Sequence, residues 1–108
     1  MIINLGRDRK IKNNEIRALF FIEKNLPFKA EKILLKNLIS GTANTMTYDL
    51  LIRIYHERND YPSLIKILDL AIKKTLKNGF YRDVKKQAVL SWILTDIEFI
   101  EPSSWLNA

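Results

Sequence analysis

The chain has 108 residues, a formal net charge of +6 and an isoelectric point of about 9.7. Its length fits one domain, and its 47% of hydrophobic residues is ordinary for a globular protein with a real core. The absence of cysteine excludes a disulfide framework and a thiolate metal site, while only three Gly and three Pro disfavour an all-β fold with many tight turns.

No segment of the sequence has the features of a secretory signal or of a membrane span. The N-terminus, MIINLGRDRKIK, lacks the long apolar run and the small-residue cleavage site of a signal peptide. No stretch approaches the roughly 20 apolar residues that cross a bilayer. We therefore expect a cytoplasmic protein without membrane contact.

Five segments have the spacing of amphipathic helices, and no segment makes a convincing strand. Short turns join the helices, so neighbours are expected to be antiparallel. The sequence predicts an all-α fold of stacked antiparallel helical hairpins, with the last of the five helices long. Its parts, in chain order, are an irregular or partly extended N-terminal segment (1–11), hairpin one (12–41), hairpin two (45–79), a long capping helix (80–101) and a tail (102–108).

Asn, Pro and Gly residues mark the expected helix boundaries. Asn13 or Asn14 is expected to cap the first helix, and Gly41 and Gly79 to end the second and the fourth. The turns NLPF and NDYP each supply a cap followed by a proline in the first turn of a helix. The capping residues are Asn25 in the first turn and Asn59 or Asp60 in the second, and the prolines are Pro27 and Pro62.

The stretch ALFFI surrounds the first helix with apolar side chains. We expect Ala18 and Phe21 to contact the second helix and Phe20 to contact the neighbouring layer. Leu19 and Ile22 would face the concave side of the stack. Either the N-terminal MIINL folds back over these two residues, or a partner or a second copy of the chain covers them.

The two hairpins align when the second is shifted back by 34 residues. Tyr55 then falls on Phe21 and Asn59 on Asn25. Three aliphatic pairs also coincide, and the prolines miss by one position: Leu64 aligns with Ala30, Leu68 with Leu34 and Ile72 with Leu38. The period indicates two copies of one hairpin.

The second hairpin, TYDLLIRIYHERNDYPSLIKILDLAIKK, resembles a tetratricopeptide repeat. The aromatic, Leu, Tyr and final Ala slots of that family hold Tyr48, Leu51, Tyr55 and Ala71. Ile52 stands where the family prefers Gly or Ala. In hairpin one the match is complementary, because the small and Tyr slots are filled by Ala18, Ala30 and Phe21 but the aromatic and Leu slots hold Asn14 and Arg17.

The resemblance covers about residues 12–76 and implies a protein–protein interaction module, such as an adaptor, a chaperone or a small inhibitor. Its ligand would be a peptide or helix in a concave groove lined by the first helix of each hairpin. The residues implied are Lys12, Glu15, Leu19 and Ile22 from hairpin one and Met46, Asp49, Arg53 and His56 from hairpin two.

The array is short, and this points to a partner. Repeat stacks generally need three or more units, so either the fifth helix is a cap or another chain supplies the missing layer. We therefore expect the partner to be another protein or a second copy of this chain. Trp105, in the polar tail, is a candidate interface anchor, whereas Trp92 is expected in the core.

A basic run around the turn at Gly79 supports an alternative function, that of a small nucleic-acid-binding or regulatory protein. Salt-dependent phosphate contacts would come from Lys73, Lys74, Lys77, Arg82, Lys85 and Lys86.

No catalytic or metal site is predicted, because His56 is the only histidine and no serine lies in a nucleophile motif. We expect no enzymatic activity, no cofactor and no small-molecule substrate.

Overall fold

The computed structural model describes residues 5–98, and it confirms the all-α fold of stacked antiparallel hairpins. Helices and turns make up all of this part of the chain, which contains no strand. The five helices are α1 (Leu5–Glu23), α2 (Pro27–Ile39), α3 (Thr45–Glu57), α4 (Tyr61–Lys74) and α5 (Asn78–Glu98). None of these helices is long and apolar enough to cross a membrane.

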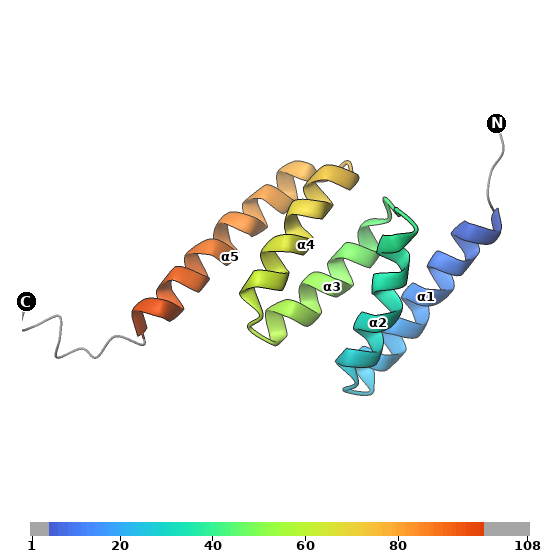
Figure 1. The fold of residues 1–108 in the computed structure, drawn as a ribbon, viewed down its shortest axis with the longest axis horizontal. Coiled ribbons are helices and arrows are strands. Elements are labelled where there is room, and N and C mark those ends of the chain that lie inside the picture. The colour runs from blue at the N-terminus through green and yellow to red at the C-terminus, as the bar shows by residue number, and fades with distance from the viewer. Residues whose placement is uncertain (1–4, 99–108) are drawn as a thin grey trace, which may run out of the picture.

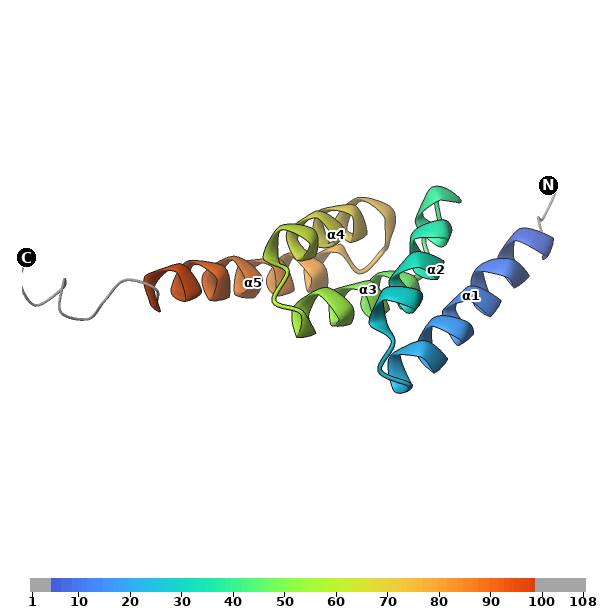
Figure 2. The same cartoon turned by 60° about the horizontal axis from the view of Figure 1, so that its bottom comes forward.

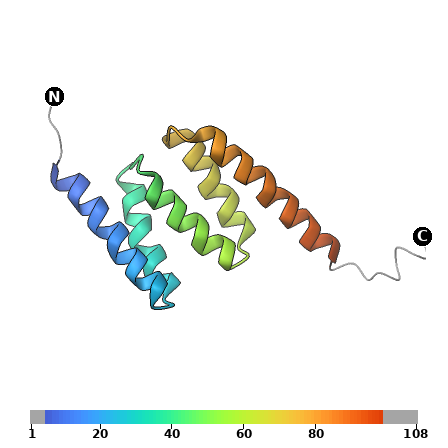
Figure 3. The ribbon, with the colours of Figure 1, turned by 180° about the vertical axis from the view of Figure 1, so that it is seen from behind.

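The helices form a row in which each one contacts the next along the chain, and α1 also contacts α3 (Figure 1). Seen from behind, α1 and α2 stand at one end of the row and α5 at the other (Figure 3). α5 packs against α4, and its C-terminal part runs out past the rest of the row (Figure 2). The stack therefore has two open ends, which are the outer side of α1 and the outer side of α5.

The 34-residue period is present in the coordinates. α1 and α3 end at equivalent residues, Glu23 and Glu57, and α2 and α4 begin at equivalent residues, Pro27 and Tyr61. Both prolines lie in the first turn of their helices, as predicted. The two hairpins therefore repeat one local structure, even though few of their residues are identical.

Asn25 and Asn59 end helices and do not begin them, which corrects the prediction that Asn25 caps α2. Their φ angles are 60° and 54°, in the left-handed region that Asn tolerates better than most residues. The amide of Asn25 donates to the Ile22 carbonyl at 3.0 Å, and that of Asn59 to the His56 carbonyl at 3.1 Å. These bonds close the last turns of α1 and α3.

The N-cap positions therefore fall one residue later than the asparagines. Leu26 precedes α2 without a side-chain capping bond. Asp60 caps α4, since its carboxylate accepts from the Ser63 amide at 3.2 Å. The second of the two proposed caps in NDYP is the correct one.

α1 begins about two turns earlier than predicted, so residues 5–11 are helical and Asn13 and Asn14 lie inside the helix. Lys and Arg are good helix formers, Asp8 lies in the first turn, and Ile11 is buried against the neighbouring helices. Leu5 belongs to this helix, roughly 21 Å along its axis from Leu19. The described part of MIINL therefore does not fold back, and its first four residues lie outside the described range.

The turn between α4 and α5 also differs from the prediction. Gly79 lies in the first turn of α5, and α4 already ends at Lys74. The hydroxyl of Thr75 donates to the Ala71 carbonyl at 2.8 Å and accepts from the Lys77 amide, so a side chain ends this helix. Leu76, which follows this helix end, is fully exposed. Gly41, in contrast, has the predicted positive φ of 74° after α2.

The core runs along the row between the helices. Its fully buried side chains include Leu34, Tyr48, Leu51, Leu64 and Leu68. Ala18 and Ala30 are also fully buried, as the small residues of a close helix contact should be.

Phe20 does not contact a neighbouring layer, because it lies on the outer side of α1 and is 56% exposed. The equivalent residue of α3, Ile54, is 2% exposed and belongs to the core. No hairpin of the described chain precedes α1, so the corresponding side of α1 stays uncovered.

Candidate functional site

The residues implied for the concave groove lie on α1 and α3 but in different environments. Lys12, Asp49, Arg53 and His56 are exposed, and Met46 is partly so, whereas Leu19 and Ile22 are half-buried against the core. Arg53 forms an ion pair with Glu57 along α3, at 3.2 Å. Trp105 lies outside the described residues.

Glu15 lies inside the protein and not on a groove surface. It is only 3% exposed, and its carboxylate accepts a hydrogen bond of 2.7 Å from the Thr47 hydroxyl of α3. Asn37 of α2 donates to the same hydroxyl and accepts from Asn14 of α1. These four buried side chains form a hydrogen-bonded network that fixes α1 on α2 and α3.

A second hydroxyl–carboxylate bond repeats the first one, 34 residues later. The Tyr81 hydroxyl of α5 donates to the Asp49 carboxylate of α3 at 2.7 Å. Asp49 is equivalent to Glu15, and Tyr81 to Thr47. Burial, and then the neighbouring Asp49, raise the pKa of Tyr81 above its ordinary value, so Tyr81 remains a donor at neutral pH. The link joins α5 to α3 through side chains, whereas α1 and α3 also contact each other along their backbones.

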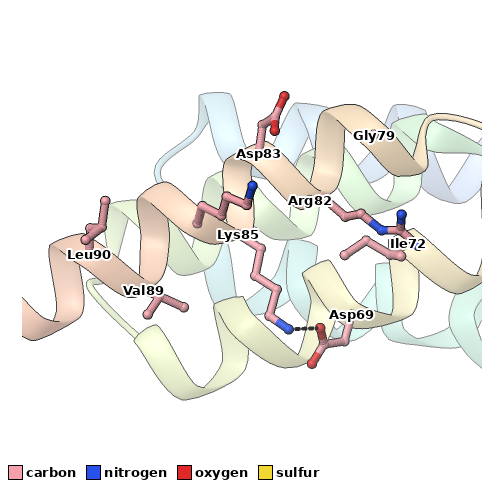
Figure 4. A pocket seen from close by; sticks show the side chains of 9 residues that line it. Asp69, Ile72, Gly79, Arg82, Asp83, Lys85, Val89 and Leu90 are labelled. Atoms are coloured by element: carbon pink, nitrogen blue, oxygen red, sulfur yellow. Dashed lines mark ion pairs between the residues drawn. The ribbon is translucent and has the colours of Figure 1, made fainter.

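An open groove of about 920 Å³ lies between α4 and α5. Ile72, Val89 and Leu90 are apolar residues of its wall, and Arg82, Lys85 and Lys86 are basic ones. Figure 4 shows Lys85 reaching from α5 to Asp69 of α4, with 2.7 Å between the ammonium and the carboxylate. Asp69 and Asp83 also line the groove, so its wall carries acidic as well as basic side chains.

This groove corresponds, by the 34-residue period, to the place where α4 lies on the earlier helices. Leu35 and Leu38 of α2 and Tyr55 of α3 line a small cleft together with residues of α4. Shifting those three positions by 34 gives Asp69, Ile72 and Val89, and all three line the α4/α5 groove. The groove is therefore the equivalent of an occupied helix site, and in the described chain no helix occupies it.

The α5 side of the groove differs chemically from the equivalent side of α3. The equivalent positions of α3 hold Tyr48, Leu51 and Ile52, of which the first two are fully buried. In α5 the same positions hold Arg82, Lys85 and Lys86. A helix that packs there meets the exposed cations Arg82 and Lys86 beside the Lys85–Asp69 ion pair, around the apolar Val89 and Ile72, which favours an occupant that carries carboxylates.

Five of the six residues of the predicted basic run are exposed near this groove, and the sixth, Lys85, is half-buried. Three of them line the groove, and Lys73, Lys74 and Lys77 are exposed at the end of α4 and in the turn to α5. The exposed phenyl ring of Phe80 stands at the start of α5.

The second half of α5 exposes a run of large apolar side chains. Leu90, Ile93 and Leu94 are 53%, 51% and 57% exposed. The prediction that Trp92 lies in the core is wrong. Its indole ring is partly exposed and stacks on the ring of Tyr61 of α4, with the centroids 6.1 Å apart. Because Tyr61 is the first residue of α4, the rest of α5 extends past that helix, as Figures 1 and 2 show.

No metal-binding group is apparent in residues 5–98, where no three His, Asp or Glu side chains gather. Comparison of the chain with models of known protein families, with curated proteins and with solved structures found no match. The repeat equivalence within the chain itself is therefore the strongest guide to its site.

Sequence reasoning predicted the basic residues but did not combine them with the apolar ones as a groove. The signal was present in the 34-residue period. Extending the alignment to the fifth helix places Lys85 and Lys86 at positions that are apolar in the second hairpin. Read alone, this mismatch suggests only that the repeat has ended. The structure shows in addition that α5 packs along α4, more extensively than α3 packs on α2, and that Tyr81 links it to Asp49 of α3.

Proposed function

We propose that this protein is a protein–protein interaction module that binds an amphipathic helix in the α4/α5 groove, antiparallel to α5. The observation that carries the proposal is the equivalence of Asp69, Ile72 and Val89 to the residues beside which α4 lies. The bound helix would complete a third hairpin, with α5 as its first helix. Adaptors, chaperones and small inhibitors all work through such binding.

The composition of the groove supports an acidic and aliphatic partner helix. Ile72, Val89 and Leu90 offer apolar contact, and each aliphatic side chain buried there contributes about 1.5–3 kcal/mol. Arg82 and Lys86 lie on the same groove as cations, with exposed side chains. Helix-in-groove recognition of this kind uses residues spaced three and four apart along the partner.

The concave groove on α1 and α3 remains a prediction. Fewer of its expected residues are accessible than the sequence implied. Glu15 is buried, and Leu19 and Ile22 already pack partly on the core. Met46, Arg53 and His56 stay available on α3 for a peptide that crosses this face. The α4/α5 groove is the better-formed site, since it combines an apolar wall with a charged rim.

A direct experiment uses two designed 18-residue helices with identical aliphatic faces, one with Glu and the other with Lys on the remaining positions. Each is labelled with fluorescein and titrated with the protein, and binding is followed by anisotropy. We expect the acidic helix to bind and the basic one not to bind. Replacement Val89→Asp should abolish binding, whereas the matched control Ile16→Asp, on the exposed outer side of α1, should leave it unchanged.

The nucleic-acid alternative is tested on the same samples with a labelled 20-nucleotide single strand and a 20-base-pair duplex. A protein that neutralises several phosphates loses affinity steeply between about 50 and 200 mM salt. Tight, salt-dependent binding of either oligonucleotide, together with no binding of the acidic helix, would overturn the proposal in favour of a nucleic-acid contact by the basic run.

A further inference from the structure

The charges of α5 are divided between its two halves. Residues 78–86 contain Arg82, Lys85 and Lys86 with the single acid Asp83. After Lys86 the chain has no further Lys or Arg, and its charged residues are all acidic: Asp96 and Glu98 within α5, and Glu101 beyond it. The exposed apolar residues Leu90, Ile93 and Leu94 lie between the basic residues, which end at Lys86, and the acidic ones, which begin at Asp96.

An antiparallel pair of such helices is complementary to itself. It sets the basic half of each helix beside the acidic half of the other, and the apolar middle against its own copy. A pairing centred on residue 91 places Lys86 opposite Asp96 of the other helix, and Val89 opposite Ile93. Residues 86, 89, 93 and 96 follow the three–four spacing that keeps positions on one face of a helix.

The direction of this pairing agrees with the vacant site. α4 runs antiparallel to α3, to which a short turn joins it, so the helix missing from the α4/α5 groove would run antiparallel to α5. A second α5 therefore has the orientation, the apolar residues and the carboxylates that the groove requires. Since α5 extends past the end of α4, its C-terminal half is free to reach another molecule (Figure 2).

We propose that the helix bound in the α4/α5 groove is α5 of a second copy of this chain. The assembly is a symmetric dimer in which each α5 completes the third hairpin of the other subunit. Such an interface uses the same surface on both chains, as two-fold dimers do. This inference rests on the proposed function, because it names the partner of the same groove.

The register is tested by charge reversal, with the oligomeric state of the 12.7 kDa chain measured by sedimentation velocity over a range of concentrations. We expect the native chain to dimerise, and Lys86→Glu and Asp96→Lys each to weaken the dimer about tenfold or more, because each creates two like-charge contacts. The double variant K86E/D96K should recover the affinity, since it restores both attractions with exchanged signs. Lys32→Glu, an equal change on the exposed face of α2, is the matched control.

A mixture of the two single variants sharpens the test. The Lys86→Glu chain should form a heterodimer with the Asp96→Lys chain, because both contacts then join opposite charges. Circular dichroism of each variant confirms that helicity is retained. Failure of the double variant to recover, or a native chain that is monomeric at all concentrations, would overturn the inference.

The outcomes for the groove and for its occupant can be separated. If the native chain is monomeric and still binds the acidic designed helix through Val89, the proposed function holds and the second copy is not its partner. If the chain is monomeric and binds neither the acidic nor the basic designed helix, the proposed function fails as well. If it is a dimer, Asp96→Lys chains retain the groove and should bind the acidic helix more tightly than the native chain.

Discussion

Two equivalent places in this molecule differ in what fills them. In α3, which contacts α2 and α4, Tyr48 and Leu51 are fully buried. In α5, which contacts α4, the same positions hold the exposed Arg82 and the half-buried Lys85, which pairs with Asp69. The two hairpins repeat one backbone, whereas α5 packs more extensively on α4 than α3 does on α2, and its side chains differ as well. The difference teaches that the end of a helical stack can keep the equivalent positions of a packing site exposed and give them a different chemistry.

The largest expected difference is in the loss of stability when Leu51 or its equivalent, Lys85, is replaced by alanine. Leu51→Ala removes a fully buried side chain and should lower the free energy of unfolding by about 2–5 kcal/mol. Lys85→Ala removes a partly exposed ion pair with Asp69 and should cost less than about 1 kcal/mol. Urea unfolding of the two variants, at a concentration where the native chain is monomeric, measures the difference. Equal losses would mean that the two sites are packed alike.

The next effect compares the two hydroxyl–carboxylate links. Thr47→Val should cost about 1–3 kcal/mol, because it leaves the buried Glu15 carboxylate without its donor. Tyr81→Phe should cost only about 1 kcal/mol, because water reaches the exposed Asp49. Chemical denaturation of both variants gives the ratio. A larger loss for Tyr81→Phe would contradict the difference in burial between the two carboxylates.

The smallest effect concerns a feature that the hairpins share. Asn25→Ala and Asn59→Ala should each lower stability by about 1 kcal/mol, since alanine is strained at a positive φ. Replacement of either asparagine by glycine should restore or slightly raise stability, because glycine adopts this conformation without strain. Thermal unfolding of the four variants tests whether the turns at Asn25 and Asn59 are equivalent. A loss at only one of the two sites would show that the turns are not equivalent.

Much of the fold could be predicted from local chemistry. Apolar residues at helical spacing, the two prolines and the 34-residue period give two hairpins of two helices each and a fifth helix, and the structure confirms these elements. The prediction that Asn25 caps α2 is wrong because asparagine favours both an N-cap and a left-handed C-terminal position, whereas in the second turn one of the two proposed caps, Asp60, is correct. Only the φ angles and the bonds to Ile22 and His56 decide between the two.

The site was less predictable, because it depends on contacts between distant residues. Nothing local distinguishes Glu15, which is buried beneath Thr47, from an exposed acid on the same helix. Likewise the basic residues of α5 look like an ordinary solvated face until the chain is folded. Their place opposite Ile72 of α4 makes them the rim of a groove.

Disulfide cross-linking tests most directly the central claim that a helix antiparallel to α5 completes the third hairpin. The chain has no cysteine, so Val89→Cys and Ile93→Cys chains each carry a single thiol. Under mild oxidation the mixed chains should form covalent heterodimers in much higher yield than either chain alone, since 89 faces 93 of the partner. Equal yields in the mixture and in the Val89→Cys chain alone, or no cross-link in a mixture that sediments as a dimer, would contradict the account.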